Sequence, residues 1–99
     1  MQEVLLEFRG RLTLANARQV LESQQAALKT ALKNTQGQQS VVADLTGLAD
    51  VDTSALAVIL QLDRDVRAHS GAPLRIRGAS QDLRSLARLS SLASVLNWD

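Results

Sequence analysis

One segment of the chain, residues 44–62, compresses a short apolar strand, a polar turn and an apolar helix into nineteen residues, DLTGLADVDTSALAVILQL. The turn Asp52, Thr53, Ser54 places three oxygen-bearing side chains directly before the helical run. In that position one side chain can cap the helix while another faces a partner protein or a kinase. The segment therefore predicts a strand-to-helix unit and indicates that its turn is the functional region.

The composition is typical of one small globular domain, which we expect to span residues 1–99. Hydrophobic residues make up 45% of the chain, but the longest apolar run, 55–60, is too short to cross a bilayer. A net charge of +1 and 2% aromatic residues argue against nucleic-acid binding. With no cysteine, disulfides and thiolate metal sites are excluded, and the N-terminal residues do not resemble a secretory signal. We therefore expect a cytoplasmic protein without direct membrane insertion.

Residue spacing predicts alternating strands and helices after an N-terminal β-hairpin that turns at Gly10. Right-handed strand-helix-strand units of this kind build an α/β sandwich with helices packed on a sheet. The predicted elements are strands at 4–8 and 12–14, a helix from Asn16 to the polar segment 34–37, a strand at 40–45, a helix over 54–69, a strand at 74–77, a helix from Ser80 and a short final strand around Val95 and Leu96.

Two motifs of the central segment resemble the signature of the STAS family, the domain shared by sulfate transporters and anti-sigma-factor antagonists. In that family a strand ends in Asp-Leu-Ser/Thr, and a turn Asp-Ser/Thr-Ser/Gly-Gly-Leu opens the next helix. Here the motifs read DLT at 44–46 and DTSAL at 52–56, with Ala55 where the family usually has glycine. The resemblance covers the whole chain. It implies an α/β, STAS-like sandwich with a mixed β-sheet of four to five strands and three or more helices, in the order β-β-α-β-α-β-α.

Among STAS proteins, the segments VDTSALAVILQL, LRIRG and LRSLARLSSLASVL are most similar to the small cytoplasmic subunit of the bacterial Mla transporter. That ABC system moves phospholipids to maintain outer-membrane lipid asymmetry. The resemblance implies a non-enzymatic accessory subunit that binds the cytoplasmic ATPase subunit and is peripheral to the inner membrane. The alternative is an anti-sigma-factor antagonist that a kinase phosphorylates on Thr53 or Ser54.

The predicted contact surface combines the polar turn with the helix behind it. Apolar residues cover a wider arc of that helix than packing on a sheet requires, so Leu56 and Leu60 are either exposed to a partner or packed against the first helix. For Thr53, the structural alternative is helix capping, which needs only one of the three turn side chains. The residues predicted to bind the partner are Asp52, Thr53, Ser54, Leu56, Ala57 and Leu60.

No catalytic motif is present in the sequence: GxxxxGK[ST], HExxH and GxSxG are absent, and no GxGxxG follows a strand. The single histidine, His69, has no second ligand or nucleophile near it in the sequence, and carboxylates do not cluster at ligand spacing. We therefore predict no catalytic residue, cofactor or metal. Trp98 either anchors the end of the chain or contacts a partner, and the sequence leaves both open.

Overall fold

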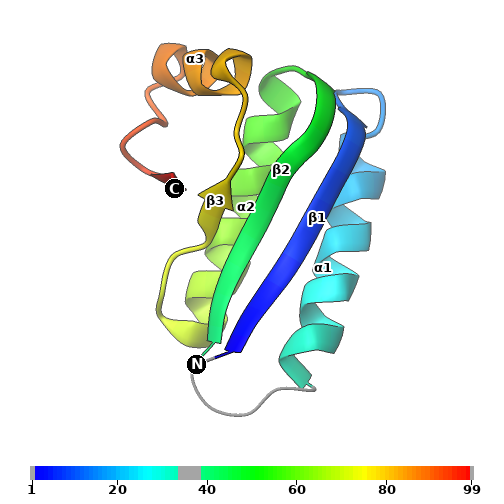
Figure 1. The fold of residues 1–99 in the computed structure, drawn as a ribbon, viewed down its shortest axis with the longest axis vertical. Coiled ribbons are helices and arrows are strands. Elements are labelled where there is room, and N and C mark those ends of the chain that lie inside the picture. Colours follow the sequence, from blue (N-terminus) through cyan, green and yellow to red (C-terminus); the bar gives the residue numbers. More distant parts are fainter. Residues whose placement is uncertain (1, 34–38, 99) are drawn as a thin grey trace.

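The computed structural model describes residues 2–33 and 39–98, which form an α/β fold (Figure 1). Four strands and three helices in these residues confirm the predicted fold class. The predicted end of the first helix at 34–37 lies outside the described residues, and none of the helices within them is long and apolar enough to span a membrane. The elements are β1 (Gln2–Leu12), α1 (Ala17–Lys33), β2 (Gln39–Val51), α2 (Thr53–Ser70), β3 (Arg75–Arg77), α3 (Gln81–Leu89) and β4 (Asn97–Trp98).

The N-terminal β-hairpin was a wrong prediction, because residues 2–12 form the single strand β1, which pairs in parallel with β2. The described sheet has the order β1-β2-β3-β4 with every pairing parallel, so the expected mixed sheet is also wrong. Gly10 has φ of 70°, a left-handed conformation that glycine adopts at little cost, and the strand continues through it. β2 carries one extra residue opposite the interval between Glu7 and Arg9, a bulge that bends the paired strands without ending them.

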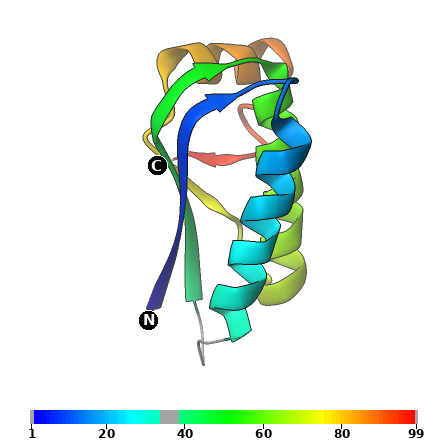
Figure 2. The same cartoon turned by 90° about the vertical axis from the view of Figure 1, so that its right-hand side faces the viewer.

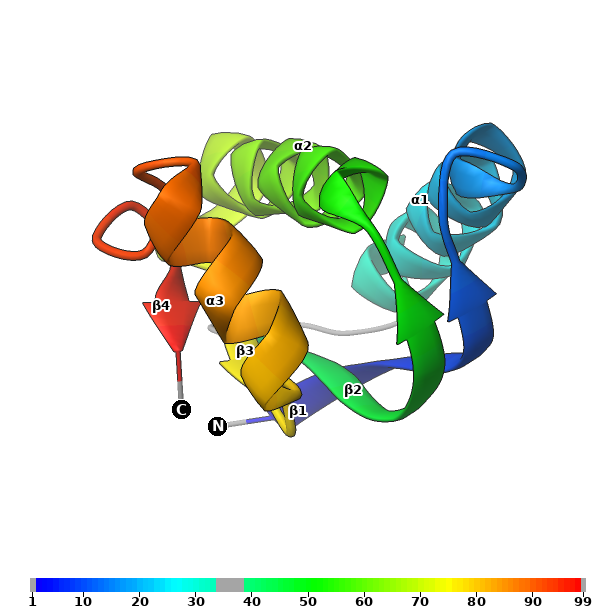
Figure 3. The ribbon, with the colours of Figure 1, turned by 90° about the horizontal axis from the view of Figure 1, so that it is seen from above.

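The helices α1 and α2 cover one face of the sheet (Figure 2), and α3 lies across one end of it (Figure 3). Alternate residues of β1, Val4, Leu6 and Phe8, are buried in the core under the helices. The opposite face carries polar side chains, among them Glu3, whose carboxylate lies 3.5 Å from the Arg77 guanidinium. This alternation follows from the two-residue period of a strand with one covered face.

The ends of α2 follow from the residues that flank it. Asp52 caps the N-terminus, and at the C-terminus Gly71, with φ of 78°, donates its N–H to the Arg67 carbonyl. Inside the helix the Asp63 carboxylate is only 3% exposed, and it accepts hydrogen bonds from the Leu74 N–H at 3.0 Å and from Arg67 Nε at 2.9 Å. The predicted second helix is confirmed to within one residue at each end.

The C-terminal third also follows the predicted order. Ser80 caps α3, since its Oγ accepts a hydrogen bond from the Leu83 N–H at 3.1 Å. The final strand β4 is short and pairs with β3 at Asn97 and Trp98, just after the predicted position. These residues close one edge of the sheet beside α3.

Candidate partner-binding site

The side-chain carboxylate of Asp52 holds the turn between β2 and α2 through both of its oxygens. Asp52 has an extended backbone, with φ of −134° and ψ of −169°, directly before the first residue of α2. Its Oδ1 accepts a hydrogen bond from the Ser54 N–H at 2.8 Å, and its Oδ2 accepts one from the Leu14 N–H at 3.0 Å. Asp52 is therefore the helix cap, and it also ties the turn to the connection between β1 and α1, 38 residues away in the sequence.

These hydrogen bonds keep the Asp52 carboxylate charged. The bond from the Leu14 N–H is the largest cause that lowers the pKa of Asp52 below its ordinary value of 3.8, and the bonds from Ser54 add to it against a smaller opposing effect of desolvation. At neutral pH a fixed negative charge therefore stands at the start of α2, where it interacts favourably with the helix dipole.

Because Asp52 provides the cap, Thr53 is relieved of that role. Thr53 lies exposed in the first turn of α2, and its side chain makes no hydrogen bond within residues 2–33 and 39–98. Ser54 is partly exposed beside it. The turn thus faces outward and presents hydroxyl groups at the helix N-terminus, the position that a partner protein or a kinase would need.

Leu14 is a candidate contact residue that the sequence analysis missed. Its side chain is 80% exposed, which is unusual for a large apolar residue, and its backbone is held beside the cap by Asp52. The loop is braced further by Asn16, whose side chain accepts a hydrogen bond from the Thr13 N–H at 3.0 Å and donates one to the Arg11 carbonyl at 2.8 Å. The predicted hairpin assigns Leu14 to a strand, and the sequence analysis therefore did not place it near the Asp52 turn.

The side chains of α2 divide between core and surface. Leu56 was predicted to bind the partner, but it is 2% exposed and belongs to the core, so it is not part of an accessible surface. Leu60 is partly buried against the same core. Ala57, one turn after Thr53, is exposed. Ala55, at the family's glycine position, is fully buried, so its methyl group fills core space. We define the α2 N-terminal surface as the accessible residues of this region: Leu14, Asp52, Thr53, Ser54 and Ala57.

The first family motif, at 44–46, has a structural role inside β2. Asp44 Oδ1 accepts hydrogen bonds from the N–H and the Oγ1 hydroxyl of Thr46, at 3.0 and 2.6 Å. The hydroxyl bond is the largest cause that lowers the pKa of Asp44. Gly78 packs so closely on Thr46 that a Cβ at that position would collide with the threonine side chain. The motif therefore fixes the chain that leaves β3 against β2.

The remaining candidates of the sequence analysis are a metal site, His69 and Trp98. In the part of the chain that is described, no group of histidine, aspartate and glutamate side chains is arranged to hold a metal ion. His69 is exposed in the last turn of α2. Trp98 donates its Nε1–H to the Ala93 carbonyl at 2.8 Å, so this side chain anchors the end of the chain.

The order of strands and helices matches the STAS fold, which a solved structure also has. The "Structure of the Anti-Sigma Factor Antagonist SpoIIAA in its Unphosphorylated Form" matches with a TM-score of 0.65 and 18% sequence identity, over 99% of this chain and 80% of that one. The family model described as "Mlab, STAS domain" matches residues 1–97, so the chain belongs to this STAS family. A comparison with curated protein sequences gave no match.

Membership of the STAS family assigns the chain a general kind of role. STAS domains are typically non-enzymatic modules that bind other proteins or regulate them. The exposed turn at the start of α2 is compatible with such a role, because it offers a polar and apolar surface on a rigid helix end.

Proposed function

We propose that this protein is a non-enzymatic accessory subunit of an ABC-type phospholipid transport system that maintains outer-membrane lipid asymmetry. In this proposal it acts in the cytoplasm, peripheral to the inner membrane, and binds the ATPase subunit of the transporter. The description of the matching family as an Mlab STAS domain supports this assignment. The α2 N-terminal surface makes the contact, with Leu60 at its partly buried border.

The observation that carries the proposal is the arrangement at Asp52. The Asp52 carboxylate caps α2, where Thr53 is exposed, and also binds the backbone of Leu14, a residue that is 80% exposed. An apolar anchor beside a polar rim is the usual composition of a protein interface. Hydrogen bonds from Asp52 and Asn16 already hold the turn and the Leu14 loop, so this surface loses less conformational freedom when a partner binds.

Docking of this kind regulates an ATPase without chemistry in the accessory chain. If the α2 N-terminal surface binds one arrangement of the ATPase more tightly than another, it shifts the ATPase toward that arrangement by the difference in binding free energy. The role of this subunit is then to support assembly or activity of the transporter.

The variant Thr53→Glu tests the contact. A carboxylate at the first turn suits the helix dipole, so the fold should be retained, but it adds charge next to Asp52 and should weaken binding to the purified ATPase subunit at least about tenfold. Calorimetry measures the affinity, and Thr30→Glu, an exposed threonine on α1, is the matched control. Unchanged affinity of Thr53→Glu would remove this surface from the interface.

A second function, that of an anti-sigma-factor antagonist, is favoured by the fold match to SpoIIAA together with the exposed Thr53. Phosphorylation there would add about 1.5 to 2 negative charges beside Asp52 and eject a partner. Intact mass spectrometry of protein isolated from cells separates the two functions. A phosphate adduct on Thr53 or Ser54, with a sigma-factor regulator as the copurified partner, would favour the second function over the first.

A further inference from the structure

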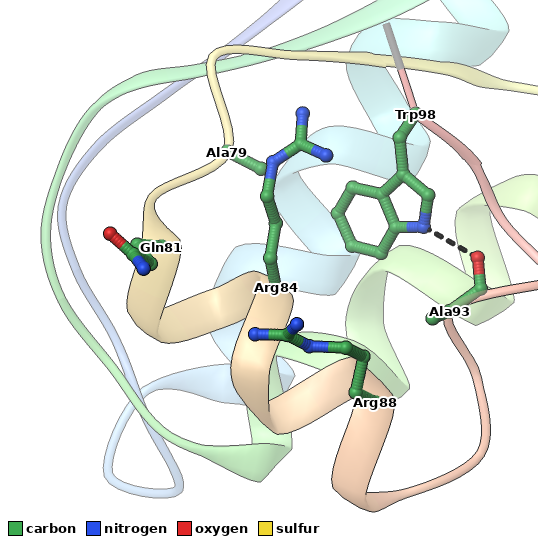
Figure 4. Close-up of a pocket in the computed structure, with 6 residues that line it drawn as sticks. All are labelled: Ala79, Gln81, Arg84, Arg88, Ala93 and Trp98. Atoms are coloured by element: carbon green, nitrogen blue, oxygen red, sulfur yellow. Dashed lines mark hydrogen bonds between the residues drawn. The ribbon is translucent and has the colours of Figure 1, made fainter.

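A concave site lies between α3 and the C-terminal strand (Figure 4). Its volume is about 480 Å³, within the range of about 300 to 1,000 Å³ typical of small-molecule sites. The residues that line it are Ala79, Gln81, Arg84, Arg88, Ala93 and Trp98. None of them belongs to the α2 N-terminal surface.

The cationic side of the cavity comes from α3. Arg84 and Arg88 are four residues apart, so successive turns of the helix place both side chains along the cavity, and the Arg88 guanidinium also donates a hydrogen bond to Ser85 Oγ at 3.2 Å. An anion beside Arg88 would gain a charged contact, because guanidinium groups match carboxylate and phosphate oxygens in geometry.

The apolar side of the cavity is a fixed indole ring. Trp98 is held by the bond from its Nε1–H to the Ala93 carbonyl, so its nitrogen is already used, and the partly buried residue lines the cavity. The Arg84 guanidinium carbon lies 5.4 Å from the ring centroid, in the range of a cation–π contact. The methyl groups of Ala79 and Ala93 complete a wall on which a flat ring can pack.

The geometry points to a binding site for a small aromatic molecule that bears one anionic group, either a carboxylate or a phosphate. The ring of the ligand packs against Trp98 beside Arg84, and its anionic group lies against Arg88. Gln81 offers a neutral amide at the rim. This site is separate from the proposed partner contact and requires no chemistry from the protein.

Trp98 also supplies the assay, because it is the one tryptophan in the sequence and its indole N–H gives a single resonance in proton–nitrogen correlation NMR. The probes are benzoate and phenyl phosphate, which separate the two anion sources. A ligand of this size is expected to bind with a Kd of about 1 mM. Saturable movement of the indole resonance with either probe supports the site, and the tighter probe identifies the anion.

Variants test the recognition itself. Arg88→Gln, on the exposed side of α3, should weaken the better probe about tenfold, because it replaces a charged donor by a neutral one. Arg18→Gln on α1, the matched control, should leave the affinity unchanged. The inference is overturned if neither probe saturates at about 10 mM. It is also overturned if neutral benzamide or inorganic phosphate binds as tightly as the better probe, or if Arg88→Gln and Arg18→Gln behave alike.

Discussion

The substitution Leu14→Ser tests whether the exposed leucine that is bonded to Asp52 through its backbone contacts the partner. Burying a whole leucine side chain contributes about 1.5 to 3 kcal/mol. Because Leu14 is 80% exposed in the free protein, most of that burial free energy can still be gained when a partner binds. A serine at this position would contribute almost none of it. The expected loss on binding the ATPase subunit is about 2 kcal/mol, which corresponds to an increase in Kd of about 30-fold.

The same substitution should leave the fold intact. An exposed side chain contributes little to the folded state, and the hydrogen bond from residue 14 to Asp52 comes from the backbone, which serine retains. The unfolding free energy should therefore change by less than about 0.5 kcal/mol, as measured by urea denaturation.

The control is Leu89→Ser, since Leu89 is 84% exposed at the end of α3, outside the α2 N-terminal surface. Calorimetric titration of both variants against the ATPase subunit compares two leucines of nearly equal exposure. Our reasoning is refuted if Leu14→Ser binds as tightly as the unaltered protein, or if Leu89→Ser weakens binding to the same extent.

Two further predictions concern carboxylates. Asp63→Ala leaves the Leu74 N–H without its acceptor and should lower the unfolding free energy by about 2 kcal/mol. Asp63→Asn keeps an acceptor oxygen and should lower the unfolding free energy less. Equal losses of unfolding free energy in urea denaturation would contradict this explanation. Because the pKa of Asp52 is lowered in the folded state, its contribution to stability is present above the unfolded value of 3.8 and is lost as the pH falls through the folded pKa. The unfolding free energy measured over a pH series should show this loss, and in Asp52→Asn the unfolding free energy should fall less at acid pH. If the pH dependence is the same in that variant, the loss of stability comes from other groups.

The sequence predicted α2 well because its signals are local. Apolar residues recur at helical spacing, Asp52 precedes the helix, and Gly71 ends it in the left-handed conformation. The wide apolar arc had two explanations, and the structure supports packing for Leu56. α2 lies between α1 and α3 as well as on the sheet, so it is covered over more of its circumference than a helix at the edge.

The N-terminal strand shows where local signals fail. A glycine between two apolar stretches is typical of a hairpin turn, but here Gly10 lies within one strand. The decisive fact is that β2 is long enough to pair with the whole of β1, and that partner begins 27 residues after Leu12. The local spacing of residues carries no signal for pairing between strands that lie so far apart in the sequence. The exposed position of Leu14 could therefore not be predicted.

The corrected topology explains why distant residues meet at one surface. In a parallel sheet the carboxyl ends of β1, β2 and β3 lie at the same end of the molecule, where the chain enters α1, α2 and α3 (Figure 1). Leu14 follows β1, Thr53 follows β2, and Gln81 of the arginine and tryptophan cavity follows β3. Had β1 been a hairpin, its second strand would have returned Leu14 to the opposite end. The parallel pairing of β1 with β2 is thus what brings the Leu14 loop to the Asp52 cap of α2, and the proposed interface depends on it.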